Sequence, residues 1–367
     1  MSESNQADSI PADPNVKVQN ASQSVINDNA TRTSAGSTME AIQGGDHTQS
    51  NIDPTSPKEH IALIGVGTIG ASFATLHILR DPHCHITIYD PAPSIGTTLP
   101  LKIQSDLSTL PSAPAIDLTS RLTFAPTLSS AVSTATIIQE QGPESPAWKT
   151  ATWAAIEASA PPTALFWSST SGIPASVQSR GMRDPHRLIV VHPYNPPLLM
   201  PLIEVVPGPG VPQALVDRTM AYWAAVGKKP ILIRAEVPGF VSNRLAFALL
   251  REAVGLVRRG VIGVEELDAL VETSMGPRWA VAGPFKSYHA GGGEGGMKAF
   301  LENIGGTIRA GWEDSDKFAV GSGEREWEGE IAGMCEEAFG EEAYERRKGK
   351  LAKVLEQTED VWQRPSS

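Results

Sequence analysis

A histidine and a glutamate lie in neighbouring apolar runs near the middle of the sequence. Residues 187–191 lead to His192, which precedes a proline-rich turn, and the apolar run 202–206 carries Glu204. A buried carboxylate needs a partner, and a histidine oriented by a carboxylate can take a proton from a substrate hydroxyl. The pair predicts general acid–base chemistry. A structural histidine bonded to a backbone carbonyl fits the same spacing.

Two further polar segments are candidates for the same site. A cluster of hydroxyl side chains, residues 168–171, ends an apolar run that begins at residue 164, and Asn243 opens a long amphipathic segment. Groups at the carboxyl end of a parallel strand face the ligand crevice, and ligand sites concentrate between domains. Each pattern is also common at ordinary strand ends and helix starts.

A glycine pattern between two apolar runs predicts a phosphate-binding turn. The run 60–64 leads into Gly65-Val-Gly-Thr-Ile-Gly70, and a helix-like segment follows. Glycines in this spacing allow a tight turn, close approach of a pyrophosphate and close packing of the helix on its strand. The start of that helix also offers free N–H groups to phosphates. The residues expected to hold the cofactor here are Gly65, Gly67, Thr68, Ile69 and Gly70.

An acidic residue at the end of the second apolar run indicates which cofactor binds. Asp90 lies 20 positions after Gly70 and closes the run 86–89. A carboxylate at this point binds both ribose hydroxyls and would repel a 2′-phosphate. The order strand, glycines, helix, strand and acid therefore predicts binding of NAD rather than NADP.

Composition narrows the class of protein. The chain has 367 residues, 41% hydrophobic and 19% charged, with a net charge of −11. These values are typical of a globular protein, and the negative charge argues against nucleic acid as a partner. No apolar run reaches membrane-spanning length, and two cysteines cannot form a disulfide framework, so we expect a cytoplasmic protein. The cluster His83-Cys84-His85 lacks further convergent ligands, and no metal site is expected.

Three parts are expected along the chain. Residues 1–57 are polar and poor in aromatic residues, which predicts a disordered tail. Residues 58–236 alternate apolar runs with amphipathic segments, which predicts a doubly wound α/β sheet of the Rossmann type. Residues 237–357 are expected to form an all-α domain. The expected strands are 60–65, 85–90, 121–124, 136–140, 164–168, 188–192 and 230–234. The expected helices are 69–79, 129–135, 146–158, 212–226, 240–259, 264–273, a run from 297, and 341–356.

Taken together, these motifs resemble the 3-hydroxyacyl-CoA dehydrogenase superfamily over residues 60 to about 305. The segments that carry the resemblance are Ser-Ser-Thr-Ser-Gly from Ser168, His-Pro-Tyr-Asn-Pro-Pro from His192, Pro-Leu-Ile-Glu ending at Glu204, and Gly-Phe-Val-Ser-Asn-Arg-Leu from Gly239. They are most similar to the lambda-crystallin/L-gulonate 3-dehydrogenase branch. The resemblance implies NAD-dependent oxidation of a 3-hydroxyl group and a homodimer formed by the helical domain.

The resemblance also assigns roles to single residues. It implies that His192 is the catalytic base and Glu204 its acidic partner. Ser171 and Asn243 match residues that hold the substrate oxygen, and Asn195 matches a residue near the substrate and the nicotinamide. These roles agree with the acid–base pair inferred from the residues themselves.

A further loop, residues 139–149, is similar to the family's cofactor loop. The match implies that Glu144 and Lys149 contact the ribose on the nicotinamide side of NAD. Glu140 is expected to be their structural neighbour.

Two features bear on the substrate. Family members that act on CoA thioesters carry a long helical hairpin after the second strand, and the proline-containing segment 91–120 is too short to build one easily. Arg278, in a turn similar to that of the lambda-crystallin branch, would grip a free carboxylate through two hydrogen bonds. A small L-3-hydroxy acid similar to L-gulonate is therefore the expected substrate. Arg278 would alternatively cap a helix or pair with surface acids.

Three other functions remain open from the sequence. One is an L-3-hydroxyacyl-CoA dehydrogenase that acts on a thioester, and another is a non-catalytic relative that binds NAD. A third is a decarboxylating β-hydroxyacid dehydrogenase. That family uses a lysine base, and the His192–Glu204 pair argues against it.

Overall fold

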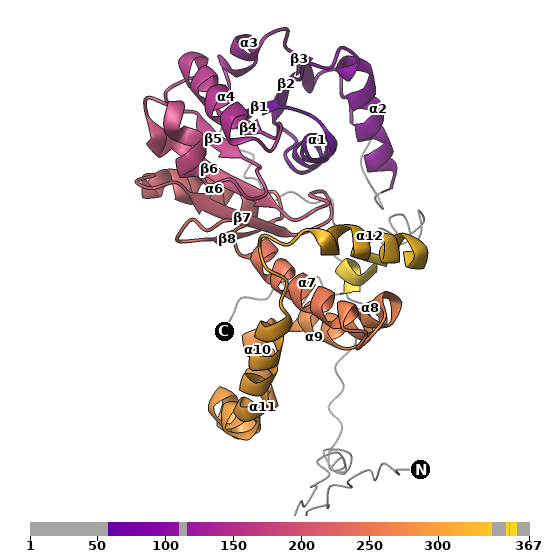
Figure 1. Ribbon diagram of the computed structural model, residues 1–367. Coiled ribbons are helices and arrows are strands. Elements are labelled where there is room, and N and C mark those ends of the chain that lie inside the picture. The colour runs from indigo at the N-terminus through magenta and orange to yellow at the C-terminus, as the bar shows by residue number, and fades with distance from the viewer. Residues whose placement is uncertain (1–57, 110–115, 340–349, 352, 358–367) are drawn as a thin grey trace, which may run out of the picture. The chain divides into compact units, whose positions relative to one another are not determined.

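A computed structural model describes residues 58–109, 116–339, 350–351 and 353–357. The predicted tail, residues 1–57, lies outside the described residues. The fold is a Rossmann-like sheet flanked by helices and followed by a helical region (Figure 1), which confirms the predicted fold class. No helix in the described ranges is long and apolar enough to cross a membrane.

Eight strands form one sheet in the order β3-β2-β1-β4-β5-β6-β7-β8. Neighbouring strands are parallel except at the β6–β7 pair, which is antiparallel. The strands are β1 His60–Ile64, β2 His85–Tyr89, β3 Leu122–Phe124, β4 Ile137–Glu140, β5 Leu165–Ser168, β6 Leu188–Pro193, β7 Leu202–Pro207 and β8 Lys229–Leu232. The first six strands therefore share one direction, and their carboxyl ends meet at one edge of the sheet.

Helices cover both faces of the sheet because its central strands are apolar on both sides. In β1, Ile61 and Leu63 belong to one hydrophobic cluster, whereas Ala62 and Ile64 belong to the other. The first cluster is completed by α1 (Thr68–Arg80), α2 (Ile95–Ser108) and α6 (Gln213–Ala225). The second is completed by α3 (Leu128–Val132), α4 (Pro146–Ser159) and α5 (Ala175–Gln178).

The first cluster also encloses a histidine. His77 on α1 is fully buried, and its Nδ1 lies 2.7 Å from the Tyr222 hydroxyl while its Nε2 lies 2.9 Å from Gln139 Oε1. Its ring packs against Phe73 and Trp223 at centroid distances of 5.9 and 5.5 Å. Both ring nitrogens thus have partners inside the core.

Helix α2 was missed in the sequence, where residues 91–120 were expected only to be too short for a long helical hairpin. The helix has 14 residues and contains Pro100, whose missing N–H removes one helical hydrogen bond. Leu99, Ile103 and Leu107 recur at intervals of four residues and pack into the first cluster, which favours the helix despite the proline. The described part of this segment contains one helix and no hairpin; residues 110–115 lie outside it.

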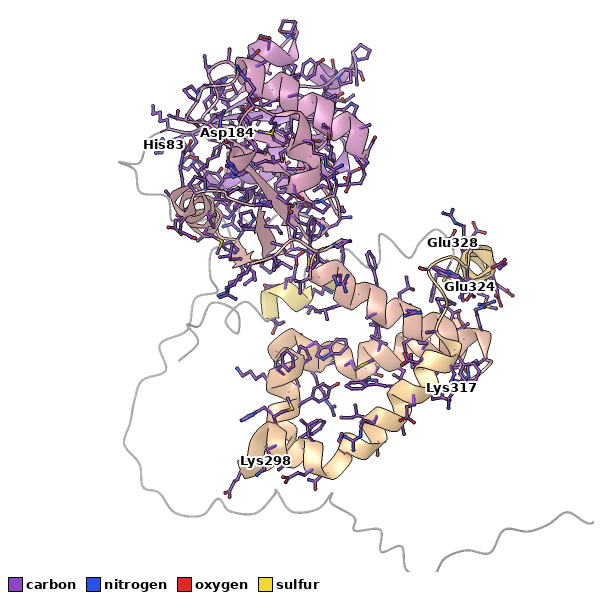
Figure 2. The ribbon with its side chains drawn as sticks, turned by 60° about the vertical axis from the view of Figure 1, so that its left-hand side comes forward. His83, Asp184, Lys298, Lys317, Glu324 and Glu328 are labelled. Atoms are coloured by element: carbon purple, nitrogen blue, oxygen red, sulfur yellow. The ribbon has the colours of Figure 1, made fainter. Side chains whose placement is uncertain are left out.

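After β8 the described chain is helical, as predicted. The helices are α7 Ser242–Arg258, α8 Val264–Thr273, α9 Met275–Val281, α10 Pro284–Gly291, α11 Gly296–Phe318 and α12 Glu326–Phe339. The helices expected at 240–259, at 264–273 and from 297 are confirmed, whereas α9, α10 and α12 were missed. Figure 2 labels Lys298 and Lys317 near the two ends of α11. The expected helix 341–356 lies mostly outside the described residues, and its described part, 350–351 and 353–356, is helical.

Candidate active site

The polar residues singled out in the sequence follow the carboxyl ends of the parallel strands. Gly65 follows β1, Asp90 follows β2, Glu140 ends β4, and His192 lies near the end of β6. Ligands bind at this edge in open α/β sheets. Glu204 reaches the same edge because β7 runs in the opposite direction and begins there.

His192 and Glu204 form a buried pair. The antiparallel register places them directly opposite each other, so both side chains leave the same face of the sheet. His192 Nδ1 lies 2.7 Å from Glu204 Oε2, and the two residues are 4% and 2% exposed. No partner for His192 Nε2 is found among the described residues. One nitrogen of the ring is therefore oriented by a carboxylate while the other remains available.

Four donors surround the Glu204 carboxylate. Oε1 accepts hydrogen bonds from the backbone N–H groups of Val241 and Ser242 at 3.0 and 2.9 Å. Oε2 accepts from the Ser242 hydroxyl at 2.6 Å as well as from His192. Burial raises the pKa of Glu204, but the hydrogen bonds from His192, Ser242 and Val241 outweigh burial and leave this pKa below its ordinary value. The pair is thus built around an ionised glutamate.

An unusual turn supplies the two backbone donors. Gly239 and Phe240 both have positive φ angles, 75° and 53°. Such an angle is uncommon for a bulky residue such as Phe240. The Phe240 ring is fully buried, with its centroid 5.3 Å from that of His192. The turn thereby packs an aromatic ring on the histidine and directs two consecutive N–H groups at its carboxylate partner.

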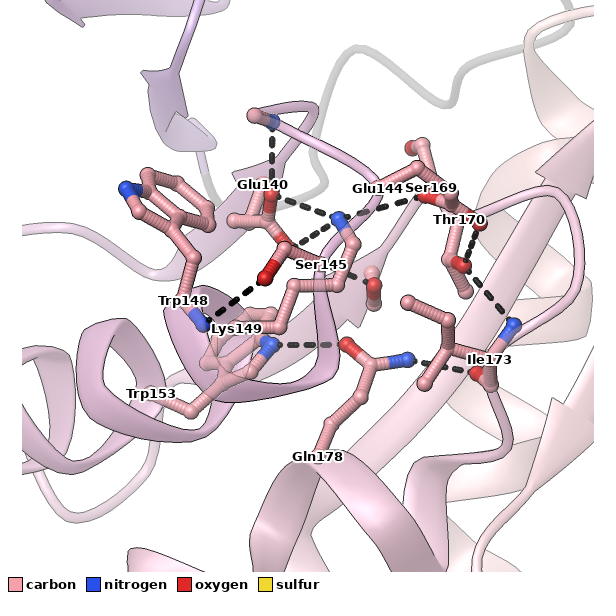
Figure 3. Close-up of polar contacts among 12 residues, drawn as sticks. Glu140, Glu144, Ser145, Trp148, Lys149, Trp153, Ser169, Thr170, Ile173 and Gln178 are labelled. Atoms are coloured by element: carbon pink, nitrogen blue, oxygen red, sulfur yellow. Dashed lines mark hydrogen bonds and ion pairs between the residues drawn. The ribbon is translucent and has the colours of Figure 1, made fainter.

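A second network lies after β5 and in the loop after β4 (Figure 3). Glu144 Oε1 accepts from the Thr170 hydroxyl, as Figure 3 shows. It also accepts from Ser171 N at 2.8 Å and from Gly172 N at 3.1 Å. Asn243 Nδ2 donates to the backbone carbonyl of Ser171 at 3.0 Å. The structure therefore brings together Ser171, Asn243 and Glu144. Since Ser242 and Asn243 are consecutive, the start of α7 ties this network to the histidine pair.

Lys149 is fully buried beneath this loop. Its Nζ lies 2.9 Å from both carboxylate oxygens of Glu140 and 3.8 Å from Glu144 Oε2. Glu140 also accepts from Gly142 N at 2.6 Å. These contacts give Glu140 the neighbouring role expected for it. Contact of Lys149 and Glu144 with a ribose stays a prediction.

The glycine turn fits a dinucleotide. Gly65 has a φ of +85°, and a Cβ on Gly70 would lie 2.3 Å from the Gly65 carbonyl oxygen, so both positions require glycine. A Cβ on Gly67 would meet nothing within 4 Å, which leaves the backbone open to a ligand. Helix α1 begins at Thr68, and the N–H groups of its first turn point out of this opening.

Asp90 closes the glycine turn from the neighbouring strand. Its Oδ2 accepts from Val66 N and its Oδ1 from Ala92 N, both at 2.8 Å. The carboxylate is thus fixed beside the phosphate-binding turn, where the sequence predicted a ribose contact. No group of three or more His, Cys, Asp or Glu residues suited to a metal ion occurs within the described chain.

The remaining candidates are less closely connected to the histidine pair. Asn195 is exposed in the loop after β6, three residues beyond His192. Arg278 is exposed on α9, and its guanidinium makes no hydrogen bond or ion pair with any residue that the structure describes. Its predicted grip on a carboxylate stays a prediction.

Several residues of the site were missed in the sequence. Ser242 and Phe240 lie in the segment before Asn243, but their residue types gave no signal that Ser242 contacts Glu204 or that Phe240 packs on His192. Lys228 was also missed: its Nζ donates to the carbonyls of Pro197 and Met200 at 2.6 and 3.0 Å, and it fixes the loop after β6. Such contacts join residues that are distant in sequence, so no local pattern indicates them.

Comparison with known proteins identifies the family. The protein-family model for the NAD-binding domain of 3-hydroxyacyl-CoA dehydrogenase matches residues 60–237. The family model for the C-terminal domain of that enzyme matches residues 239–318. The chain belongs to the 3-hydroxyacyl-CoA dehydrogenase family. It is therefore an NAD-dependent oxidoreductase of the type that acts on CH–OH groups.

Relatives of this dehydrogenase include proteins named 3-hydroxyacyl-CoA dehydrogenase and proteins named L-carnitine dehydrogenase. A 3-hydroxyacyl-CoA dehydrogenase of Gibberella moniliformis is 38% identical over 258 residues, which cover 69% of this chain and 79% of the relative. An L-carnitine dehydrogenase of Streptomyces griseus is 38% identical over 263 residues, covering 71% and 78%. Another L-carnitine dehydrogenase, from Oceanobacillus iheyensis, is 32% identical over 308 residues, covering 82% and 99%.

A solved structure supports the fold over most of this dehydrogenase. The crystal structure of 5-formyl-3-hydroxy-2-methylpyridine 4-carboxylic acid 5-dehydrogenase, described as an NAD⁺-dependent dismutase, has a TM-score of 0.63 and 26% identity. It covers 84% of this chain and 100% of the solved chain.

Proposed function

We propose that this dehydrogenase oxidises the 3-hydroxyl of a small free L-3-hydroxy acid to the 3-keto acid, with His192 as general base. The observation that carries the proposal is the buried His192–Glu204 pair, in which Nδ1 is held at 2.7 Å and Nε2 has no partner within the described residues. A structural histidine would be expected to use both nitrogens. A non-catalytic relative would have no need of a carboxylate held ionised in an apolar setting.

The residues have separate tasks in this mechanism. Glu204 accepts a hydrogen bond from the Nδ1–H group of His192, which leaves the lone pair of Nε2 free to take the proton of the substrate hydroxyl. Ser171 and Asn243 would hold the substrate oxygen as negative charge develops on it. Asn195 would lie beside the substrate and the nicotinamide. NAD⁺, when bound, would supply the acceptor for the hydride that leaves C3.

The cofactor would lie along the carboxyl edge of the sheet. The turn from Gly65 to Gly70 and the first turn of α1 would hold the pyrophosphate, and Asp90 would bind the ribose of the adenosine half. Glu144 and Lys149 would position the ribose on the nicotinamide side. The Glu140 ion pair supports this by holding Lys149 against the loop.

The names of relatives guide the choice of substrate. L-carnitine is a 3-hydroxy acid with a free carboxylate, so we take it as the first candidate, and we take L-gulonate as the second because of the motif resemblance. The single helix α2 supports a free acid, since it gives no hairpin for CoA in the described residues. Arg278, which is exposed and has no ion-pair partner among the described residues, would bind the carboxylate. The relative from Gibberella moniliformis favours an alternative substrate class, an L-3-hydroxyacyl-CoA.

We also propose a homodimer formed through the helical region. Large apolar side chains are exposed along α7, α9, α10 and α11, and an apolar surface on this scale is typical of an interface. Examples are Leu245 (62% exposed), Phe247 (57%), Phe285 (82%) and Trp312 (67%). Light scattering of the purified protein should give twice the chain mass.

Formation of NADH by purified protein tests the function. L-carnitine, L-gulonate, L-3-hydroxybutyrate and L-3-hydroxybutyryl-CoA are each supplied with NAD⁺ or NADP⁺. Preference for a free acid with NAD⁺ supports the proposal and the role of Asp90. If only the thioester is turned over, the proposed free-acid substrate is wrong and an L-3-hydroxyacyl-CoA is the substrate. Arg278→Lys and Arg278→Gln should raise KM for the free acid but leave kcat largely unchanged, because both remove bidentate binding.

A further inference from the structure

The hydroxyl of Ser242 shares an acceptor with the proposed base. Glu204 Oε2 accepts from Ser242 Oγ at 2.6 Å and from His192 Nδ1 at 2.7 Å. Ser242 is also the first residue of α7, and its backbone N–H donates to Oε1 at 2.9 Å. One residue thereby contacts both oxygens of the carboxylate that orients His192.

A second hydrogen-bond donor on Glu204 Oε2 weakens the electrostatic effect of this carboxylate on His192. A carboxylate stabilised by hydrogen bonds is a weaker base, and less of its negative charge remains to stabilise an imidazolium beside it. The hydroxyl also restricts the carboxylate plane, since Oε1 is already fixed by two backbone N–H groups. Both effects act on His192 through Glu204, because no contact joins Ser242 to the ring.

Within the described ranges, no charged group other than His192 contacts the Glu204 carboxylate. Its neighbour on β8 is Ile231, its neighbour on β6 is His192, and α7 presents Val241 and Ser242. Phe240 covers the ring of His192. Among the described residues, His192 is the titratable side chain in contact with Glu204. The Ser242 hydroxyl is the other side-chain group that contacts this carboxylate, and it can therefore adjust the negative charge of Glu204.

We propose that Ser242 is a positioning residue: its hydroxyl lowers the proton affinity of His192 by sharing Glu204 Oε2, so that the base is neutral at a lower pH. The consequence for turnover rests on the proposed function, whereas the effect on the histidine itself does not. A purely structural role, as a helix-start residue that anchors α7 to β7, would affect stability but not the titration of His192.

A matched pair of variants separates these roles. Ser242→Thr keeps the hydroxyl, and Ser242→Val has the same shape without it. NMR titration of the imidazole nitrogens in the full chain, with His192 assigned by its loss in His192→Gln, reports the ring directly. We expect the titration midpoint of His192 to rise by about half a pH unit in Ser242→Val and to stay at the wild-type value in Ser242→Thr. Ser242→Ala serves as the second hydroxyl-free variant if the valine distorts α7.

Enzyme kinetics test the consequence for turnover. The acid limb of the pH profile of kcat/KM should move upward by the same amount in Ser242→Val, and kcat at high pH should change by less than about threefold. Identical titrations of the Thr, Val and wild-type proteins would overturn the proposal. If no 3-hydroxy acid is oxidised, the proposed function fails, but the NMR titration still decides the role of Ser242.

Discussion

Two buried histidines in the sheet region show how similar surroundings produce different roles. His77 and His192 are 0% and 4% exposed, and each contacts an aromatic ring. His77 uses both nitrogens, with neutral partners Tyr222 and Gln139. His192 uses one nitrogen, with an ionised partner, and its other nitrogen has none within the described chain.

The partners explain the difference. Burial lowers the pKa of His77 to about 4, since no carboxylate compensates for the loss of water. His77 therefore stays neutral and links α1, α6 and β4. His192 has a carboxylate beside Nδ1, which is the arrangement that the proposed general base requires. Burial alone does not distinguish the structural histidine His77 from the proposed base His192.

The largest effect should come from removing the proposed base. We expect His192→Gln to lower kcat by about 10³-fold or more, because general base catalysis is lost. NAD binding and the melting temperature should change little. His186→Gln is the matched control and should leave turnover unchanged, since His186 is exposed and its ring Nδ1 lies 2.9 Å from the Pro209 carbonyl oxygen. Full turnover by folded His192→Gln would refute the assignment of the base.

Removing the structural histidine should act on stability instead. His77→Ala leaves the Tyr222 hydroxyl and Gln139 Oε1 buried without their partner and creates a cavity beside Trp223. We expect the free energy of unfolding to fall by about 3 kcal/mol, measured by denaturant titration. The folded fraction should keep wild-type kcat. If His77→Ala lowered kcat but left the free energy of unfolding unchanged, the structural role of His77 would be refuted.

Altering the partner of His192 should have a smaller effect than removing the ring. In Glu204→Gln the amide can present an NH₂ group to Nδ1, which favours the tautomer whose Nε2 already carries a proton. We expect kcat to fall by about 100-fold with KM nearly unchanged, and steady-state kinetics at several pH values measures this. Glu144→Gln, in the second network, should raise KM for NAD⁺ more than it lowers kcat.

The smallest expected effect is the dependence of the free energy of unfolding on pH, which should report the titration of His77. Between its ordinary pKa of 6.5 and about 4, His77 is protonated in the unfolded chain but not in the folded one. Unfolding then takes up a proton at His77. The contribution of His77 to the free energy of unfolding therefore falls as the pH falls, by about 1.4 kcal/mol per pH unit at most. The free energies of unfolding of wild type and His77→Gln should therefore become more similar as the pH falls from 7 to 4. Below pH 6.5 the difference should shrink by up to about 1.4 kcal/mol for each pH unit. A constant difference would show that His77 does not titrate in this window.

The sequence predicted the sheet better than the helical region. Seven expected strands were found because each is a short apolar run bounded by turn residues. Helices α9, α10 and α12 were missed because they are short or rich in Gly, Pro and Glu, and their exposed apolar residues show no regular period. Helix α2 was missed because Pro100 outweighed an apolar spacing that packing later satisfies.

Residue types and short spacings by themselves determined the glycine turn, Asp90 and the candidacy of His192 and Glu204, because turns, strand ends and apolar runs are local properties of the chain. Only the tertiary structure decided what surrounds Glu204. The antiparallel β6–β7 register places it opposite His192, and a turn nearly forty residues away brings Ser242 and two backbone N–H groups to the same carboxylate. Side-chain hydrogen bonds depend on distances of a few tenths of an ångström and on which face of a strand is covered. Those are set by how distant elements pack, and no sequence spacing encodes them.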